Sequence, residues 1–150
     1  MSAAEWAFDA AAHRALIATL TPDMPAKELE AACEPIVRDI LENHEGFNGV
    51  GKGPALPGTP FDYFGFRGTR PYVVELKASR RQFNLPHETQ RHRLQALLAA
   101  FPDLGVALLQ IKACDGVYRI LYDEDVTRLF TIRHGARGPG LALQHWSGDS

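Results

Sequence analysis

The stretch FDYFGFRGTRPYVVELK, residues 61–77, predicts the central hairpin of this protein. Its two ends, residues 61–66 and 72–77, are rich in aromatic and β-branched residues, which are typical of strands. Between them, residues 67–71 contain a glycine and a proline and favour a turn. We therefore expect two antiparallel strands joined by a short turn.

The second strand of this hairpin carries charged residues where a buried strand should be apolar. Glu75 and Lys77 are two residues apart and share one face, while Val74 and Leu76 point the other way, toward a core. The short turn brings Asp62 beside Glu75. Buried carboxylates placed together repel each other unless one is protonated or a cation lies between them. A hard divalent ion, Mg²⁺ or Mn²⁺, suits such oxygen ligands.

In this interpretation Lys77 lies next to the metal, where it can contact an attacking water or a phosphate oxygen. The alternative is an ordinary solvated pair of Glu75 and Lys77, with Asp62 in a simple turn. Glu-x-Lys alone is a common pattern. The combination is more specific, because an aspartate in an aromatic strand precedes an apolar run that ends in Glu-x-Lys.

The remaining elements complete a mixed α/β (α+β) fold. The pattern predicts helices at residues 3–20, 26–44 with a kink at Pro35, 87–101 and 123–130, and strands at 47–50, 106–111 and 117–121. We expect a central mixed β-sheet of about five strands flanked by helices. The chain is interpreted as one domain, 1–150, with an N-terminal helical extension (1–25), a core (26–122), and a short helix with a loose tail (123–150).

Composition excludes several classes of protein. The 150 residues are 45% apolar and 23% charged, which is ordinary for a globular domain. No apolar run approaches the length of a membrane-spanning helix, and the first residues lack the basic cluster of a signal peptide. Two cysteines, Cys33 and Cys114, are too few for a disulfide scaffold or a four-cysteine zinc site. We expect a reduced, cytoplasmic setting and no membrane partner.

The net charge of −2 hides a positive segment. Residues 1–50 have a balance of −6, residues 51–100 a balance of +5, and residues 101–150 a balance of −1. Most bases of the middle third are arginines, whose planar donor fork suits phosphate. This segment is either a phosphate-binding surface or a solvated surface that pairs with the acidic first third.

Two motifs together suggest a family. GTPFD at residues 58–62, followed by VVELK at residues 73–77, resembles the PD-(D/E)xK nuclease superfamily, which has the restriction-endonuclease-like fold. The resemblance covers roughly residues 26–122, and small archaeal-type Holliday junction resolvases are the nearest subgroup. In the family the proline directly precedes the aspartate, whereas Phe61 intervenes here.

The resemblance implies a metal-dependent endonuclease that hydrolyses DNA phosphodiester bonds, with junctions or branched DNA as one expected substrate. Asp62, Glu75 and the main-chain carbonyl of Leu76 would hold Mg²⁺ or Mn²⁺, and Lys77 would position the attacking water. A glutamate of the first core helix would join the metal site. This is Glu34 by position, or alternatively Glu30. The next helix would present Gln90, and phosphates would be bound by Lys52, Arg67, Arg70, Arg80, Arg81, Arg91 and Arg93.

Three further expectations concern partners and alternatives. Cutting both strands of DNA usually requires two sites, so we expect a homodimer. A catalytically inactive nuclease-fold module that binds nucleic acid or a protein is the main alternative, since a fold can persist while its activity is lost. A restriction or phage-defence nuclease is a further one, for which 150 residues leave little room for a recognition element.

Overall fold

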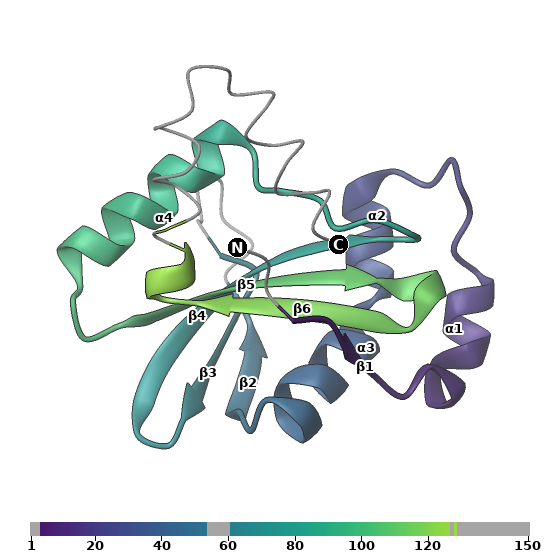
Figure 1. Cartoon of the computed structure of the whole chain (residues 1–150), viewed down its shortest axis with the longest axis horizontal. Coiled ribbons are helices and arrows are strands. Elements are labelled where there is room, and N and C mark those ends of the chain that lie inside the picture. Colours follow the sequence, from purple (N-terminus) through teal and green to yellow (C-terminus); the bar gives the residue numbers. More distant parts are fainter. Residues whose placement is uncertain (1–3, 54–60, 127, 129–150) are drawn as a thin grey trace.

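A computed structural model describes residues 4–53, 61–126 and 128 of the protein (Figure 1). Residues 54–60, which were expected to form a loop and include the Gly58–Pro60 part of the family motif, lie outside the described residues. So does the predicted tail from residue 129 onward. The chain is helical again at residues 124–126, as expected for a helix that begins after Asp123.

The described strands form one six-stranded mixed sheet in the order β1-β6-β5-β4-β3-β2. The sheet confirms the α+β expectation but has one strand more than predicted. Only β4 and β5 pair in parallel, and every other neighbouring pair is antiparallel. The strands are β1 (Trp6–Ala7), β2 (Asn48–Lys52), β3 (Tyr63–Arg67), β4 (Arg70–Ser79), β5 (Gly105–Lys112) and β6 (Val117–Tyr122).

The predicted hairpin is present as β3 and β4. Tyr63 is opposite Val74 and Arg67 is opposite Arg70, so the turn consists of Gly68 and Thr69. Gly68 has a φ of +60°, a conformation that glycine adopts at little cost. From β4 the chain crosses through α4 (Glu88–Ala100) to reach its parallel neighbour β5, since a parallel pair requires such a long connection.

The expected helix at residues 3–20 is only partly correct. The chain begins with β1, which pairs with the edge of β6, and continues into η1 (Ala10–His13) and α1 (Arg14–Ala18). A strand of two residues has no periodicity of its own. Its conformation depends on the partner strand, where Trp6 lies opposite Tyr118.

The second predicted helix is divided where the proline indicated. It consists of α2 (Ala26–Ala32), α3 (Glu34–Asp39) and η2 (Ile40–His44), with the break at Cys33. Pro35 occupies the first turn of α3, where a missing backbone N–H costs little. The break therefore confirms the kink.

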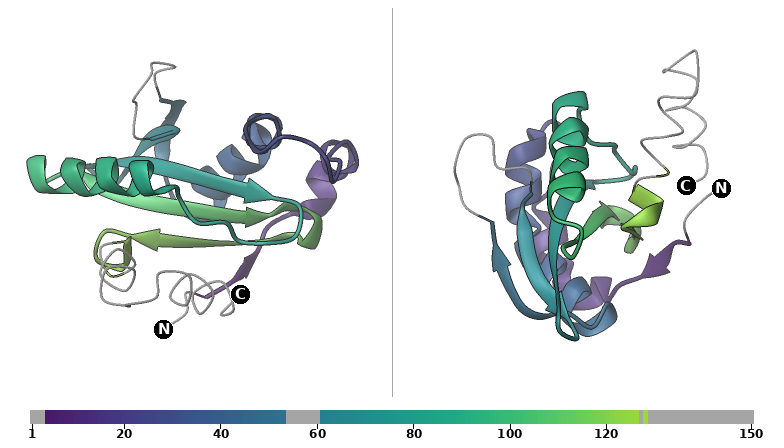
Figure 2. Two further views of the ribbon diagram at one scale, coloured as in Figure 1. Left: turned by 90° about the horizontal axis from the view of Figure 1, so that it is seen from above. Right: turned by 90° about the vertical axis from the view of Figure 1, so that its left-hand side faces the viewer.

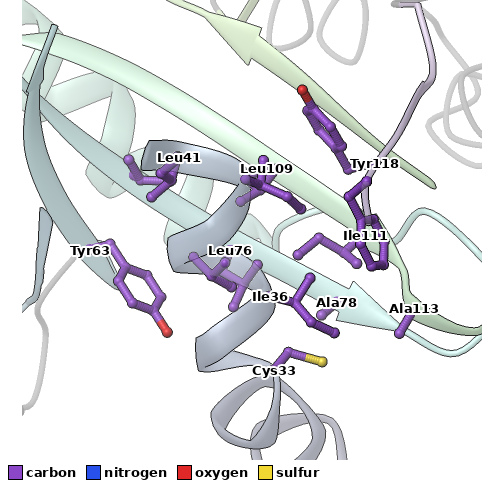
Figure 3. Packing of buried hydrophobic residues seen from close by; sticks show 14 of the residues in the cluster. Cys33, Ile36, Leu41, Tyr63, Leu76, Ala78, Leu109, Ile111, Ala113 and Tyr118 are labelled. Atoms are coloured by element: carbon purple, nitrogen blue, oxygen red, sulfur yellow. The ribbon is translucent and has the colours of Figure 1, made fainter. Parts of the chain in front are cut away.

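Helices cover both faces of the sheet, and each face has its own core. In Figure 1, α4 lies above the left-hand part of the sheet, α1 lies at its right-hand end and α3 lies below it, and Figure 2 shows the same elements from two further directions. Figure 3 shows Cys33 and Ile36 facing Leu76 and Ala78 in the larger core. The smaller core lies on the opposite face, where Val73, Val106 and Leu108 pack with Leu94 of α4.

Strand alternation therefore places Glu75 and Lys77 on the α4 face, as predicted, because Val74 and Leu76 belong to the larger core. Among the described residues, no helix is long and apolar enough to cross a membrane.

Candidate active site at the edge of β4

The site forms at the start of β3. Because β3 pairs only with the first half of β4, the second half of β4 has no neighbouring strand on its β3 side. The last pairing contact is the Asp62 N–H, which donates to the Val74 carbonyl at 2.9 Å. Beyond this point carboxylates replace strand carbonyls. The Leu76 N–H donates to Asp62 Oδ2 at 2.8 Å, and the Ala78 N–H donates to Glu30 Oε2 at 3.3 Å. Two acidic side chains thus line the open edge of β4.

Glu75 and Lys77 lie together beside this edge. Glu75 is 2% exposed and Lys77 is 9% exposed, so both charged groups are buried. The Lys77 Nζ atom is 3.9 Å from Glu75 Oε2, which is too long for a good hydrogen bond. Among the described residues Glu75 Oε2 has no hydrogen-bond partner. A buried carboxylate oxygen of this kind is costly unless a ligand binds it.

Burial and neighbouring charge change how these acids ionise. Burial raises the pKa of Glu75 to about 9, and the carboxylate of Asp62 contributes, while Lys77 opposes the rise. Burial also raises the pKa of Glu30 to about 7, again opposed by Lys77. Protonation thus relieves the repulsion between these acids, as a bound cation also would.

We expect Glu75→Gln to stabilise the metal-free protein at alkaline pH. The folded-state pKa of Glu75 lies above the unfolded one, so the wild-type residue costs stability as pH rises from about 4.5 toward 9. Glutamine keeps the shape and removes the charge. Urea unfolding in EDTA should show a gain of about 1–3 kcal/mol above neutral pH and little change near pH 4.

The control is Glu28→Gln, which changes an exposed glutamate in the first turn of α2. It should leave the pH dependence of the unfolding free energy unchanged. An equal response to pH in wild type and Glu75→Gln would show that Glu75 is ionised in the folded protein.

The structure places Glu30, the alternative, in this site and places the first choice, Glu34, elsewhere. Glu34 lies beyond the helix break at Cys33, where Arg38 Nε is 3.0 Å and Lys52 Nζ is 3.4 Å from its carboxylate. These neighbours lower its pKa. The chain changes direction at this break. Glu30 therefore lies at the edge of β4 and Glu34 lies near β2, although they are only four residues apart.

Gln90 and Arg91 have structural contacts that differ from the predicted roles. Gln90 Oε1 accepts the His87 N–H at 3.1 Å and so caps the start of α4. Arg91 is 5% exposed, and its guanidinium contacts the Pro86 carbonyl and the Glu88 carboxylate. Because α4 turns the Arg91 side chain inward, its predicted contact with DNA stays a prediction that this conformation does not support.

The other predicted phosphate contacts differ in their surroundings. Arg70 is 2.8 Å from Asp123 and Arg81 is 2.7 Å from Asp115, whereas Arg67 lies over the ring of Tyr122, 4.3 Å from its centroid. Lys52 is the partner of Glu34 described above, and Arg93 is exposed on α4. Much of the positive segment is thus compensated by acids distant in the sequence.

Arg80 and Arg81 line a cleft of about 320 Å³ at the carboxyl end of β4. Ala78 and Gln82 contribute to its walls, and the segment between α1 and α2 faces them. The Arg80 Nε atom is buried and has no hydrogen-bond partner among the described residues. The cleft therefore presents cationic side chains next to the residue that contacts Glu30.

Two buried polar residues that the sequence analysis missed hold the loop of this cleft. Gln110 Nε2 donates to the Asn84 carbonyl at 2.7 Å, and Arg119 Nε donates to Gln110 Oε1 at 2.7 Å. Arg119 also lies over the ring of Phe83. Gln110, a polar residue inside the otherwise apolar run 106–111, is the sequence signal for these hydrogen bonds.

No protein-family model matches the chain, and no curated protein matches it. Within the part of the chain that the structure describes, no three histidine, cysteine, aspartate or glutamate side chains are grouped as a metal centre. The donor set at the open edge is thus a pair of carboxylates with main-chain groups.

Proposed function

We propose that this chain is a metal-dependent endonuclease with a restriction-endonuclease-like core, of the PD-(D/E)xK type, that hydrolyses DNA phosphodiester bonds. One observation carries the proposal: Asp62, Glu75 and Lys77 meet at the open edge of β4, where a buried Glu75 oxygen has no hydrogen-bond partner among the described residues. The β3–β4 hairpin and the helical crossover to β5 are consistent with that core.

The donors of this edge fit a hard divalent cation. Asp62, Glu75 and the main-chain carbonyl of Leu76 would hold Mg²⁺ or Mn²⁺. The Leu76 N–H faces Asp62, and the carbonyl of the same residue in an extended strand faces the same side. A small number of protein ligands is enough for Mg²⁺, because the ion usually keeps several of its bound waters. When bound, the ion polarises a phosphate and makes a bound water more acidic.

The side chains have separate tasks in the proposed reaction. A water oxygen forms a bond to phosphorus while the bond to the leaving sugar oxygen breaks. Lys77 donates hydrogen bonds to the water or to a phosphate oxygen and stabilises the charge that develops there. Glu30 fixes the β4 backbone at Ala78. Arg80 and Arg81 follow the end of β4 and line the cleft there. Arg80 would contact a neighbouring phosphate, and Arg81 would do so by exchanging its partner Asp115 for one.

The test is a cleavage assay with linear duplex DNA, single-stranded DNA, RNA and a four-way DNA junction. Each substrate is incubated with the protein in Mg²⁺, in Mn²⁺ and in EDTA. We expect DNA cleavage in the presence of either metal and none in EDTA. The product ends report whether the cuts are internal, as an endonuclease requires.

Binding without cleavage of any substrate would instead favour the inactive nuclease-fold module. Cleavage that persists in EDTA would contradict the metal-dependent reaction. Cleavage of RNA alone would retain the site but contradict DNA as the substrate.

A further inference from the structure

Two large aromatic side chains lie uncovered on the face of the sheet that carries the proposed active site. Phe64 is 41% exposed and Phe66 is 45% exposed. Both belong to β3 and point away from Tyr63, which is buried in the larger core. They therefore share a sheet face with Glu75 and Lys77 of the adjacent strand.

The glycines of β2 explain why these rings lie along the sheet. A Cβ atom added to Gly51 would be 2.6 Å from the ring of Phe64, and one added to Gly49 would be 3.7 Å from the ring of Phe66. Each ring thus covers the backbone of the neighbouring strand. One side of the ring contacts the sheet, and the rest of the side chain is accessible to solvent.

The rings are aligned with the proposed active site. Phe64 is two residues and Phe66 four residues beyond Asp62, which corresponds to about 7 and 13 Å along an extended strand. In the opposite direction, β4 leads from Glu75 to the cleft with Arg80 and Arg81. Along the length of the hairpin, the aromatic rings of β3, the acidic edge of β4 and the cleft beyond its carboxyl end therefore follow one another.

We propose that Phe64 and Phe66 form a stacking platform for unpaired nucleobases of the substrate. This inference rests on the proposed function and specifies its substrate as a DNA strand with a single-stranded segment next to the cut. Bases stack on aromatic rings in single-stranded nucleic acid recognition, whereas the bases of a duplex are already stacked. A strand whose phosphate lies at Asp62 can place its following bases over these rings.

The test measures binding in EDTA, so that no cleavage is needed. Fluorescence anisotropy compares a short single-stranded oligonucleotide with an abasic strand of the same length. The variants are Phe64→Leu, Phe66→Leu and the double replacement. We expect each single variant to bind the base-containing strand about 5- to 100-fold more weakly, because a stacked base contributes about 1–3 kcal/mol, and the double variant to bind it more weakly still. Binding of the abasic strand should not change.

Two controls separate stacking from damage to the fold. Trp6→Leu removes a larger exposed ring from β1 at the far edge of the sheet and should leave both affinities unchanged. Phe64→Tyr together with Phe66→Tyr keeps the rings and should retain wild-type binding. Thermal unfolding followed by circular dichroism checks that all variants are folded.

Equal weakening for both strands, or no weakening for either, would overturn the inference. A change of molar mass in light scattering of the double variant would instead assign these rings to an interface between copies of the chain. The two proposals fail separately. Ring-dependent binding without any metal-dependent cleavage overturns the nuclease, and cleavage with ring-independent binding overturns the platform.

Discussion

Replacing Lys77 with methionine is expected to reduce the rate of Mg²⁺-dependent DNA cleavage by about 10²- to 10³-fold, the loss typical when one donor to a developing charge is removed. Methionine preserves most of the volume of this buried side chain and removes only its charged group. The measurement is the single-turnover cleavage rate at saturating protein. Because Lys77 is not a proposed metal ligand, the thermal stabilisation by Mg²⁺ should persist.

Lys112→Met provides a matched control for this replacement. The Lys112 side chain is 13% exposed against 11% for Lys77, and it lies on the same sheet, over the ring of Phe83 and 4.0 Å from Glu5. Its replacement should leave the cleavage rate within about twofold of wild type, as expected for a residue outside the active site. Equal rates for Lys77→Met and wild type would remove Lys77 from the reaction.

The position of Lys77 was predictable because strand alternation depends only on local sequence. Residues 72–77 fix which side chains share a face, and the short turn fixes which part of β3 lies opposite. The sequence therefore predicted the proximity of Asp62 and Glu75. It did not predict that the carboxylates of Asp62 and Glu30 would take the place of a strand along β4, because that depends on where α2 packs.

The errors arose where distant parts of the chain determine the outcome. The choice between Glu34 and Glu30 depends on the direction of the helix after Cys33. Pro35 predicted that the helix would bend there, but the sequence does not give the direction of the bend. Counting bases also overstated the free positive charge. Asp115 and Asp123 are remote in sequence from the arginines that they neutralise. Similarly, β1 pairs with the edge of β6, a partner that is remote in the sequence.

Asp62→Asn is expected to abolish both metal-dependent cleavage and stabilisation by the metal. Removing one of two carboxylate ligands from a site with few protein donors should cost several kcal/mol, or about 10³-fold in rate. Asparagine keeps an oxygen that can accept the Leu76 N–H, so the edge of β4 should retain its shape. In thermal unfolding, Mg²⁺ should raise the midpoint of wild type and leave that of Asp62→Asn nearly unchanged.

Glu34→Gln is the decisive comparison, since Glu34 was the first choice from sequence and is held by Arg38 and Lys52 instead. It should keep both the cleavage rate and the response to Mg²⁺. If Glu34→Gln lost the metal response while Asp62→Asn kept it, the ion would bind near β2 and the open edge of β4 would not be the catalytic centre. If both variants kept it, neither carboxylate would be a required ligand. Protonation of Glu75, and not a bound cation, would then relieve the repulsion at the edge of β4.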